Sequence, residues 1–381
     1  MKLTDVCDFQ GGSQPPKEEW SYEKQDGFIR MLQIRDFTQR EKVTPEYIKL
    51  SNNTKICEAD DILIARYGAS IGKILTGLAG AYNVAIMRTI PDETILKKRY
   101  LYYYLKSSYF QNNILNVGSR AAQAGFNKED LSKLSIHCPK IEEQDDIVYI
   151  LEIVEKIIAE RERELKLLDE LIKARFVEMF GMPGVDNKGW GLRKLGDCCE
   201  LNPKKVKDTR LITGLEVSFV PMTAVSEDGA IDLSDTKLYE EVKTGFTYFA
   251  ENDVLMAKIT PCMENGKGAV AVGLTNGIGF GSTEFHVLRP INGLSNPYWI
   301  HTLTSIKAFR KDAAANMTGS AGQRRVPATF LNNYKVSLPP IELQNQFADF
   351  VAQLDKSKFA VQKALDEAQL LFDSLMQQYF G

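Results

Sequence analysis

The clearest pattern in the chain is a long run in which apolar residues return at alternating steps of three and four. Between positions 141 and 180 there is no glycine or proline, and Glu, Leu, Ile, Lys and Arg dominate. These residue types favour a helix, which at this length extends over about 60 Å. The alternating steps are typical of a coiled-coil seam. The seam residues that we expect to hold the helix against a partner are Leu151, Val154, Ile158, Leu165, Leu168 and Ile172.

The same pattern returns 200 positions later, between 341 and 380. Its matching seam residues are Val351, Leu354, Val361, Leu365, Phe372 and Leu375. At Arg161, Arg175 and Lys358 the seam carries a charge, and the position 200 residues away is apolar each time. The two helices are thus predicted to be unlike partners.

A helix with one apolar stripe and charged residues on its other faces must bury that stripe to be stable. We expect the two long helices to bury their stripes against each other as an antiparallel coiled coil, with the globular parts at opposite ends related by an approximate two-fold axis. The alternative is that each helix packs on its own globular part. Forty residues are more than a small module covers, which favours the coiled coil.

The chain is a tandem repeat. LSIHCPKIEEQDDIV (134–148) matches YKVSLPPIELQNQFA (334–348) at an offset of 200, and KLTDVCDF (2–9) matches KLGDCCEL (194–201) at an offset of 192. We predict an α+β fold: two globular α/β modules in tandem, each followed by a long helix. The predicted bounds are module 1 (1–140), a central helix (141–181), module 2 (182–340) and a C-terminal helix (341–381).

Each module contains a strand-like apolar run that ends in a cation and enters a polar loop closed by Gly-Lys. The two copies are DDILIARYGASIGK (60–73) and NDVLMAKITPCMENGK (252–267), with Arg66 and Lys258 as the cations. A second shared feature is a loop that begins with Gly-Ser and carries Gln and Arg, in GSRAAQAGFN (118–127) and GSAGQRRVPATF (319–330). The two modules share a plan but differ in their polar side chains.

Length and composition fit such a two-module globular protein. The 381 residues are 44% hydrophobic and 25% charged, no apolar run approaches the roughly 18 residues that span a bilayer, and the first residues lack the apolar core of a signal peptide. The six cysteines contain no CxxC pair and the three histidines lie far apart, so no metal site is predicted. We expect a cytoplasmic protein with no membrane contact.

Net charge, −3 for the whole chain, differs by segment. Residues 1–140 hold 20 Lys and Arg against 16 Asp and Glu, and residues 182–340 hold 18 against 16; the long helices hold 6 against 12 and 3 against 6. Both modules are thus slightly basic and the helices acidic. These small excesses do not by themselves indicate nucleic-acid binding, but they remove the objection that the overall charge raises.

No catalytic motif is apparent. The nearest match to the Asn-Pro-Pro-aromatic loop of amino-methyltransferases is SNPYW (295–299), which lacks the second proline and reads as the start of a helix. GIGFG (277–281) resembles a cofactor loop only superficially, because a polar STEF strand rather than a helix is expected after it. We find no P-loop, helicase motif or nuclease carboxylate cluster, so the chain is predicted not to be an enzyme.

Several of these segments together resemble the specificity subunits of type I restriction-modification systems, over essentially the whole chain. They are the RYG strand end with GAYNVAI (80–86), TGSAGQRRVP (318–327), the GSTEFHVLRP strand (281–290) and the LPPIELQ entry (338–344) to the last helix. The resemblance implies two target-recognition domains that each read half of a split DNA sequence, on a coiled coil that sets their spacing. It also implies as partners double-stranded DNA, two methyltransferase subunits that modify adenine N6, and restriction or translocase subunits. S-adenosylmethionine, ATP and Mg²⁺ are expected in those partners only, with no cofactor in this chain.

If the modules read DNA, cations and amides on their loops are the candidates, because Arg pairs with guanine, Asn or Gln with adenine, and Lys more often with phosphate. In module 1 we predict DNA contacts at Arg30, Gln33, Arg35, Arg66, Tyr67, Lys73, Arg120 and Gln123, with GGSQPPKEEW (11–20) as a reading loop. In module 2 we predict them at Lys258, Asn265, Lys267, Gln323, Arg324 and Arg325. For each residue the alternative is a solvated surface charge or a contact to a methyltransferase subunit.

Two other functions remain open from the residues. One is a scaffold whose coiled coil and modules bind proteins rather than DNA, which the lack of a strongly basic stripe favours slightly. The other is a self-sufficient methyltransferase, which the missing cofactor and base-holding motifs oppose.

Overall fold

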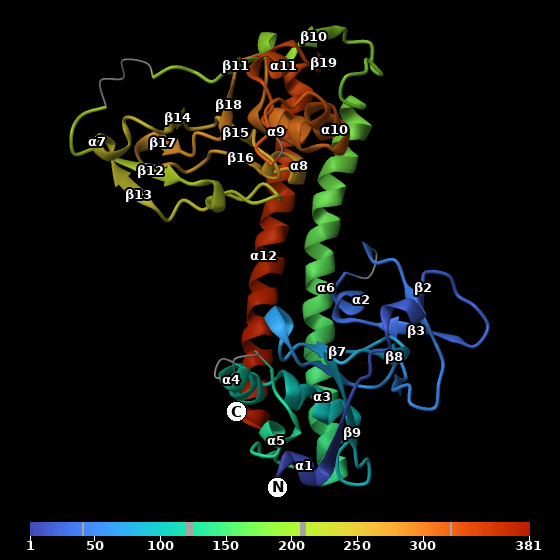
Figure 1. Ribbon diagram of the computed structural model, residues 1–381. Helices are drawn as coiled ribbons and strands as arrows, with labels where there is room; N and C mark the ends of the chain where they lie inside the picture. The colour runs from blue at the N-terminus through green and yellow to red at the C-terminus, as the bar shows by residue number, and fades with distance from the viewer. Residues whose placement is uncertain (40–41, 119–124, 206–210, 321) are drawn as a thin grey trace. The chain divides into compact units, whose positions relative to one another are not determined.

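The computed structural model describes residues 1–39, 42–118, 125–205, 211–320 and 322–381. The chain divides into two compact units, which are described separately. Unit 1 comprises Met1–Glu160 together with Ala364–Gly381, and unit 2 comprises Arg161–Lys363. Each unit therefore contains one module and parts of both long helices (Figure 1).

Unit 1 contains two sheets. The first has the strand order β1-β9-β6-β7 and is antiparallel throughout. The second has the order β2-β4-β3-β8-β5, in which β3 and β8 are parallel. The strands are β1 (Cys7–Gly11), β2 (Trp20–Ser21), β3 (Phe28–Leu32), β4 (Glu46–Lys49), β5 (Ile56–Cys57), β6 (Leu63–Ala65), β7 (Ile74–Leu75), β8 (Gly80–Tyr82) and β9 (Ile86–Pro91). The helices of module 1 are α1 (Leu3–Val6), α2 (Ile34–Thr38), α3 (Lys98–Lys106), α4 (Ser108–Gly118) and α5 (Lys128–Leu131).

Unit 2 repeats this topology. Its four-stranded sheets β11-β18-β15-β16 and β13-β12-β17-β14 match β1-β9-β6-β7 and β4-β3-β8-β5, and β12 is again parallel to β17. In addition, β10 and β19 form a two-stranded antiparallel sheet. The strands are β10 (Leu192–Lys194), β11 (Cys199–Leu201), β12 (Glu216–Val220), β13 (Thr236–Leu238), β14 (Thr247–Ala250), β15 (Val254–Ala257), β16 (Gly268–Val270), β17 (Ile278–Gly281), β18 (Phe285–Pro290) and β19 (Lys335–Ser337). The helices of module 2 are α7 (Tyr239–Val242), α8 (Cys262–Asn265), α9 (Pro297–Ser305), α10 (Lys307–Ala315) and α11 (Ala328–Asn333). The tandem repeat predicted from residue matches is confirmed.

Two local expectations have different outcomes. SNPYW does begin a helix, since the Asn296 side chain accepts the N–H of Tyr298 at 2.9 Å and Pro297 occupies the first turn of α9. The strand expected across GSTEF is wrong at its start: residues 278–281 are themselves β17, the next residues form a turn, and β18 begins at Phe285. The glycines of β17 have a packing reason, because a Cβ at Gly279 would lie 2.1 Å from the ring of Phe249.

The long helices form as predicted, as α6 (Ile141–Phe180) and α12 (Ile341–Phe380). All the predicted seam residues on both helices are buried or half-buried. In unit 2 the rings of Phe180 and Phe347 lie 5.4 Å apart, and in unit 1 Ile147 and Leu151 share a core with Met376 and Phe380. Early residues of one helix thus meet late residues of the other, so the pairing is antiparallel. No helix in the described part of the chain has the length and apolarity needed to cross a membrane.

A buried glutamine at the start of each long helix joins that helix to its module. The Gln144 amide accepts the backbone N–H of Lys97 at 3.0 Å and donates to the carbonyls of Ile95 and Pro139 at 2.7 and 2.9 Å. Its repeat partner Gln344 accepts the N–H of Asn296 at 2.8 Å. Gln344 then donates to the carbonyls of Leu294 and Pro339 at 3.1 and 2.9 Å. Both side chains are fully buried, so these bonds fix where each helix leaves its module.

Candidate nucleic-acid interface

In module 2 the loop that contains Gln323, Arg324 and Arg325 is tied to the end of β15. The N–H of Val326 donates to the carbonyl of Lys258 at 2.9 Å, and the N–H of Thr260 donates to the carbonyl of Arg324 at 3.0 Å. The structure therefore brings Lys258 and the 318–326 loop together, although about 60 residues separate them in the sequence.

The two adjacent arginines of this loop have different partners. Arg325 forms a two-bond ion pair with Glu284, with N···O distances of 2.9 and 2.8 Å. These bonds lower the pKa of the Glu284 carboxyl. Arg324 instead donates to the carbonyls of Ala314 and Met317 at 2.9 and 3.3 Å, near the end of α10. Arg325 remains 40% exposed at its side chain, whereas the Arg324 guanidinium mainly holds the loop.

A buried histidine, His286, is hydrogen-bonded to the same loop. His286 Nε2 lies 2.8 Å from the carbonyl of Val326, so this nitrogen carries the proton, and Nδ1 accepts from the Asn202 amide at 3.1 Å. Burial lowers the pKa of His286, which keeps the ring neutral. His286 is thus a positioning residue for the loop.

The other two predicted residues of module 2 belong to a different neighbourhood. The Asn265 amide donates to Glu227 at 2.8 Å, and the Lys267 ammonium donates to the carbonyl of Met222 at 3.3 Å. Both side chains therefore contact the 222–227 segment rather than the 318–326 loop. The six predicted residues of module 2 form two clusters, not one.

Module 1 repeats the contact between the strand end and the late loop. Arg66 donates to the carbonyl of Phe126 at 3.3 Å and its guanidinium lies 5.0 Å from the ring centroid of Tyr67. Tyr67 pairs with Gly125, where a Cβ would lie 2.4 Å from the tyrosine ring. Lys73 is exposed. Arg120 and Gln123 lie outside the described residues.

The remaining candidates of module 1 are held by carboxylates. Arg30 pairs with Asp36 at 2.8 Å, and both Gln33 and Arg35 donate to Glu46. The predicted reading loop 11–20 begins beside Arg66, since a Cβ at Gly11 would lie 3.2 Å from the Arg66 guanidinium. This loop start and the strand-end cation are therefore neighbours.

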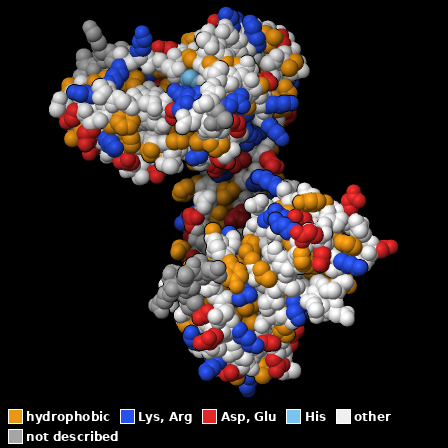
Figure 2. Space-filling model, in the orientation of Figure 1, with side chains coloured by type: hydrophobic (Ala, Val, Ile, Leu, Met, Phe, Trp, Pro, Cys, Tyr) orange, Lys and Arg blue, Asp and Glu red, His pale blue; other side chains and the backbone are white. Residues whose placement is uncertain are grey.

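Guanidinium and amide groups lie near strand ends, where nucleic acid can reach them. Carboxylates of the same chain, however, form ion pairs with Arg30, Arg35 and Arg325. Figure 2 shows basic side chains interspersed with acidic ones over the visible face of each unit rather than gathered in a stripe. Sequence reasoning missed Asp36, Glu46 and Glu284 because it considered only cations and amides. Asp36 and Glu46 lie only 6 and 11 residues from Arg30 and Arg35, so nearby carboxylates were a usable signal there. Glu284 lies 41 residues from Arg325 and has no such local signal.

Comparison with known proteins agrees with this architecture. The family model described as type I restriction modification DNA specificity domain matches residues 1–168 and 187–368. The Escherichia coli EcoAI specificity subunit is 37% identical over 195 residues and the EcoEI subunit 38% identical over 198. These matches cover 49% and 50% of this chain but only 32% of each relative, about a third of its length. The MjaVIII specificity subunit of Methanocaldococcus jannaschii is 20% identical, over 85% of this chain and 81% of that protein.

Two solved structures have the same fold. A chain from a type I R-M system aligns over 100% of this chain and 96% of its own length, with a TM-score of 0.57 and 16% identity. The S subunit from M. genitalium aligns over 100% and 95%, with a TM-score of 0.54 and 14% identity. With the family model matching both modules, this chain belongs to the type I restriction modification DNA specificity family.

Proposed function

We propose that this chain is the DNA-reading subunit of a type I restriction-modification complex, in which each module recognises one half of an asymmetric, bipartite target. The observation that carries the proposal is that the two modules share one backbone topology but have different side chains at matching positions. Arg66 in module 1 corresponds to Lys258 in module 2, and Ala85 corresponds to Glu284. Side chains with different hydrogen-bonding groups on one frame suit the reading of two different base sequences.

The catalytic steps belong to partner subunits in this proposal. Two methyltransferase subunits bind S-adenosylmethionine and modify adenine N6, and restriction subunits use ATP and Mg²⁺, while this chain binds none of these cofactors and acts without catalysis in the cytoplasm. Family membership supports this division of labour.

The proposal is tested by co-expressing the chain with a methyltransferase subunit of a type I system that copurifies with it and sequencing the methylome of the host. We expect one bipartite motif with a fixed spacer. Exchange of residues 1–140 for module 1 of another specificity subunit should change one half-site and leave the other intact. A methylome without any motif that depends on this chain would contradict the proposal.

The joint contribution of Arg325 and of Arg324, which holds the same loop, is tested by salt titration of DNA binding with the full complex. Arg324→Ala/Arg325→Ala should weaken binding and lower the slope of log affinity against log salt, by about one for each phosphate that is no longer neutralised. Arg193→Ala, at an exposed position of β10, is the matched control and should keep the wild-type slope. Equal affinity and slope in the double variant would remove these residues from the interface.

A protein-binding scaffold is the second candidate, because Arg30, Arg35 and Arg325 are all paired with carboxylates of the same chain. In that case the partner subunits would copurify with the chain, but module exchange would leave the methylated motif unchanged.

A further inference from the structure

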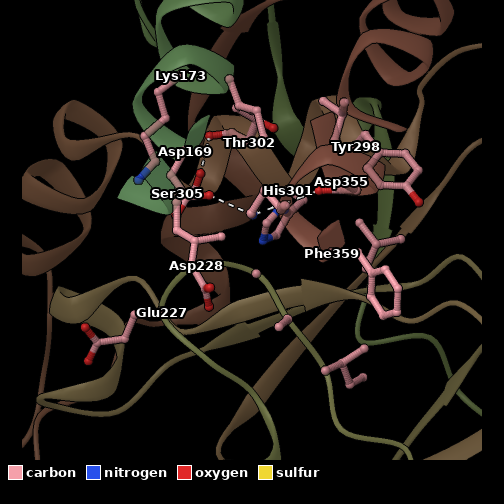
Figure 3. A pocket seen from close by; sticks show the side chains of 18 of the residues that line it. Asp169, Lys173, Glu227, Asp228, Tyr298, His301, Thr302, Ser305, Asp355 and Phe359 are labelled. Atoms are coloured by element: carbon pink, nitrogen blue, oxygen red, sulfur yellow. Dashed lines mark hydrogen bonds and ion pairs between the residues drawn. The ribbon is translucent and has the colours of Figure 1, made fainter. Parts of the chain in front are cut away.

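Unit 2 contains a cavity of about 430 Å³ that the predicted DNA-contact residues do not line. Its walls come from α6, α12, α9 and the 227–231 turn between β12 and β13. Figure 3 shows His301 near the middle of this space, with Asp169 and Lys173 from α6, and Asp355 and Phe359 from α12, around it. The cavity therefore lies where the sheets of module 2 meet the long helices within the same unit.

The cavity is shaped by specific contacts. Gly229 has φ +94° and lies against the imidazole edge, because a Cβ there would lie 2.8 Å from His301 Cε1. Only glycine adopts this conformation readily while allowing the backbone to come so close. Glu227 in the same turn accepts a hydrogen bond from Asn265 at 2.8 Å. The turn is thus bonded to Asn265 at Glu227 and lies against His301 at Gly229.

The lining is negatively charged and rich in acceptors. Four carboxylates, of Asp169, Glu227, Asp228 and Asp355, face two ammonium groups, of Lys173 and Lys358, which gives a formal charge of −2. The Lys358 ammonium lies 2.7 Å from Asp169 and 3.9 Å from Asp355, so it compensates Asp169 and in part Asp355. Lys173 is then the other ammonium group of a lining that still contains Glu227 and Asp228. A cation is therefore favoured over an anion in this space.

His301 adds an acceptor to the same lining. Its Nε2 lies 3.1 Å from the carbonyl of Gly268 and donates to it, while burial lowers the pKa of the ring and keeps it neutral. Nδ1 of a neutral ring with this tautomer carries a lone pair. Within the described ranges no residue donates to this nitrogen, which leaves it available to the N–H of a ligand.

The rest of the lining suits the carbon chain of such a ligand. Val270, Val272 and Ile231 provide apolar surface, and the rings of Tyr298 and Phe359 can face a cationic group. The Phe359 side chain is 76% exposed, so a large apolar surface is open to a ligand at this cavity. A volume of this size is that of small-molecule pockets rather than of protein interfaces.

We propose that this cavity binds a small organic polycation of the polyamine class, such as spermidine or agmatine, between Asp228 and Asp355. The ammonium or guanidinium groups pair with the carboxylates and with His301 Nδ1, and the methylene chain lies on the valines and Phe359. Such a ligand contacts the 227–231 turn, α9 and both long helices at once. Its binding therefore stabilises the junction of module 2 with the helices, and it requires no DNA.

The test is isothermal titration of the full chain with spermidine and with agmatine, in the absence of DNA. We expect saturable binding of one equivalent and at least tenfold weaker affinity in Asp228→Asn/Asp355→Asn. The control Glu200→Gln/Asp349→Asn removes two exposed carboxylates elsewhere in unit 2 and should stay within twofold of the wild type. Equal losses in both double variants would show nonspecific attraction to an acidic protein and would overturn the proposal.

A second measurement on the unchanged protein avoids any dependence on folding of the variants. In ¹⁵N-histidine-labelled chain, either ligand should shift the imidazole resonances of His301 and leave those of the exposed His137 in place. No saturable binding of either probe at millimolar concentration, or no shift at His301, contradicts the cavity as a polyamine site.

Discussion

The ammonium group of Lys358 on α12 lies 2.7 Å from a carboxylate oxygen of Asp169 on α6. Lys358 occupies a position of the coiled-coil seam where the other helix has an apolar residue, and the side chains are only 17% and 22% exposed. A charge in a seam is tolerated when a partner lies opposite it, and it disfavours other registers. This ion pair is therefore a reason why α6 and α12 pair with each other rather than each with a copy of itself.

Replacing Lys358 by methionine should lower the free energy of unfolding by about 1–2 kcal/mol, because Asp169 is left without its partner in a half-buried position. Urea unfolding of Lys358→Met, Asp169→Asn and the double variant should give a coupling energy of about 1 kcal/mol. Lys356→Met, at an exposed position of the same helix, is the control. If Lys358→Met is as stable as the wild type, the ion pair has no role in pairing.

The buried glutamines predict a second effect on stability. Gln344→Leu leaves the N–H of Asn296 and the carbonyls of Leu294 and Pro339 without this partner. A decrease of about 3 kcal/mol in the free energy of unfolding is expected, since each unsatisfied buried group costs about 1–3 kcal/mol. Hydrogen exchange should quicken at Asn296 in particular. Gln144→Leu should do the same at Lys97 in unit 1, while Gln346→Leu, at an exposed position, should leave exchange unchanged.

Stability should fall as the pH drops below the ordinary histidine pKa of 6.5. Burial lowers the pKa of both His286 and His301 in the folded chain. Below pH 6.5 the unfolded chain therefore binds protons that the folded chain does not, which favours unfolding by up to about 1.4 kcal/mol per pH unit for each histidine. Above that pH both states are neutral at these residues and the effect is absent.

The measurement is urea unfolding at pH 7.5, 6.5 and 5.5. His301→Gln should lose less stability over this range than the wild type, because it removes one of the two groups. His137→Gln, at an exposed position, should follow the wild-type curve. A His301→Gln curve parallel to the wild type would mean that the ring takes up its proton over the same pH range in the folded and the unfolded chain.

If the helices set the spacing of the half-sites, shortening both should change the spacer of the target. Deleting residues 162–168 from α6 and 359–365 from α12 removes one heptad from each, about 10 Å, or about three base pairs. The methylome should then show an altered spacer or no methylation, with the half-sites unchanged. An unaltered spacer would show that another part of the complex determines it.

The sequence alone determined the repeat and the long helices. A run without glycine or proline and a seam at steps of three and four depend only on neighbours within one helix, so α6 and α12 were predictable nearly to the residue. The cation at the end of each repeated strand was predictable because it directly follows the apolar run in the sequence. The prediction of a strand across GSTEF was wrong at its start, because a short polar segment is compatible both with a turn and with the end of a strand.

Only the tertiary structure decided which polar groups are partners. Arg325 and Glu284, Arg35 and Glu46, and Lys358 and Asp169 are joined by folding across many residues, and no periodicity in the chain relates them. Whether a cation is free to meet a ligand depends on such partners, which is why the residue types of the candidate sites could be predicted but not their grouping. The cavity around His301 has the same origin, since its walls come from segments that meet only when module 2 folds against the two helices.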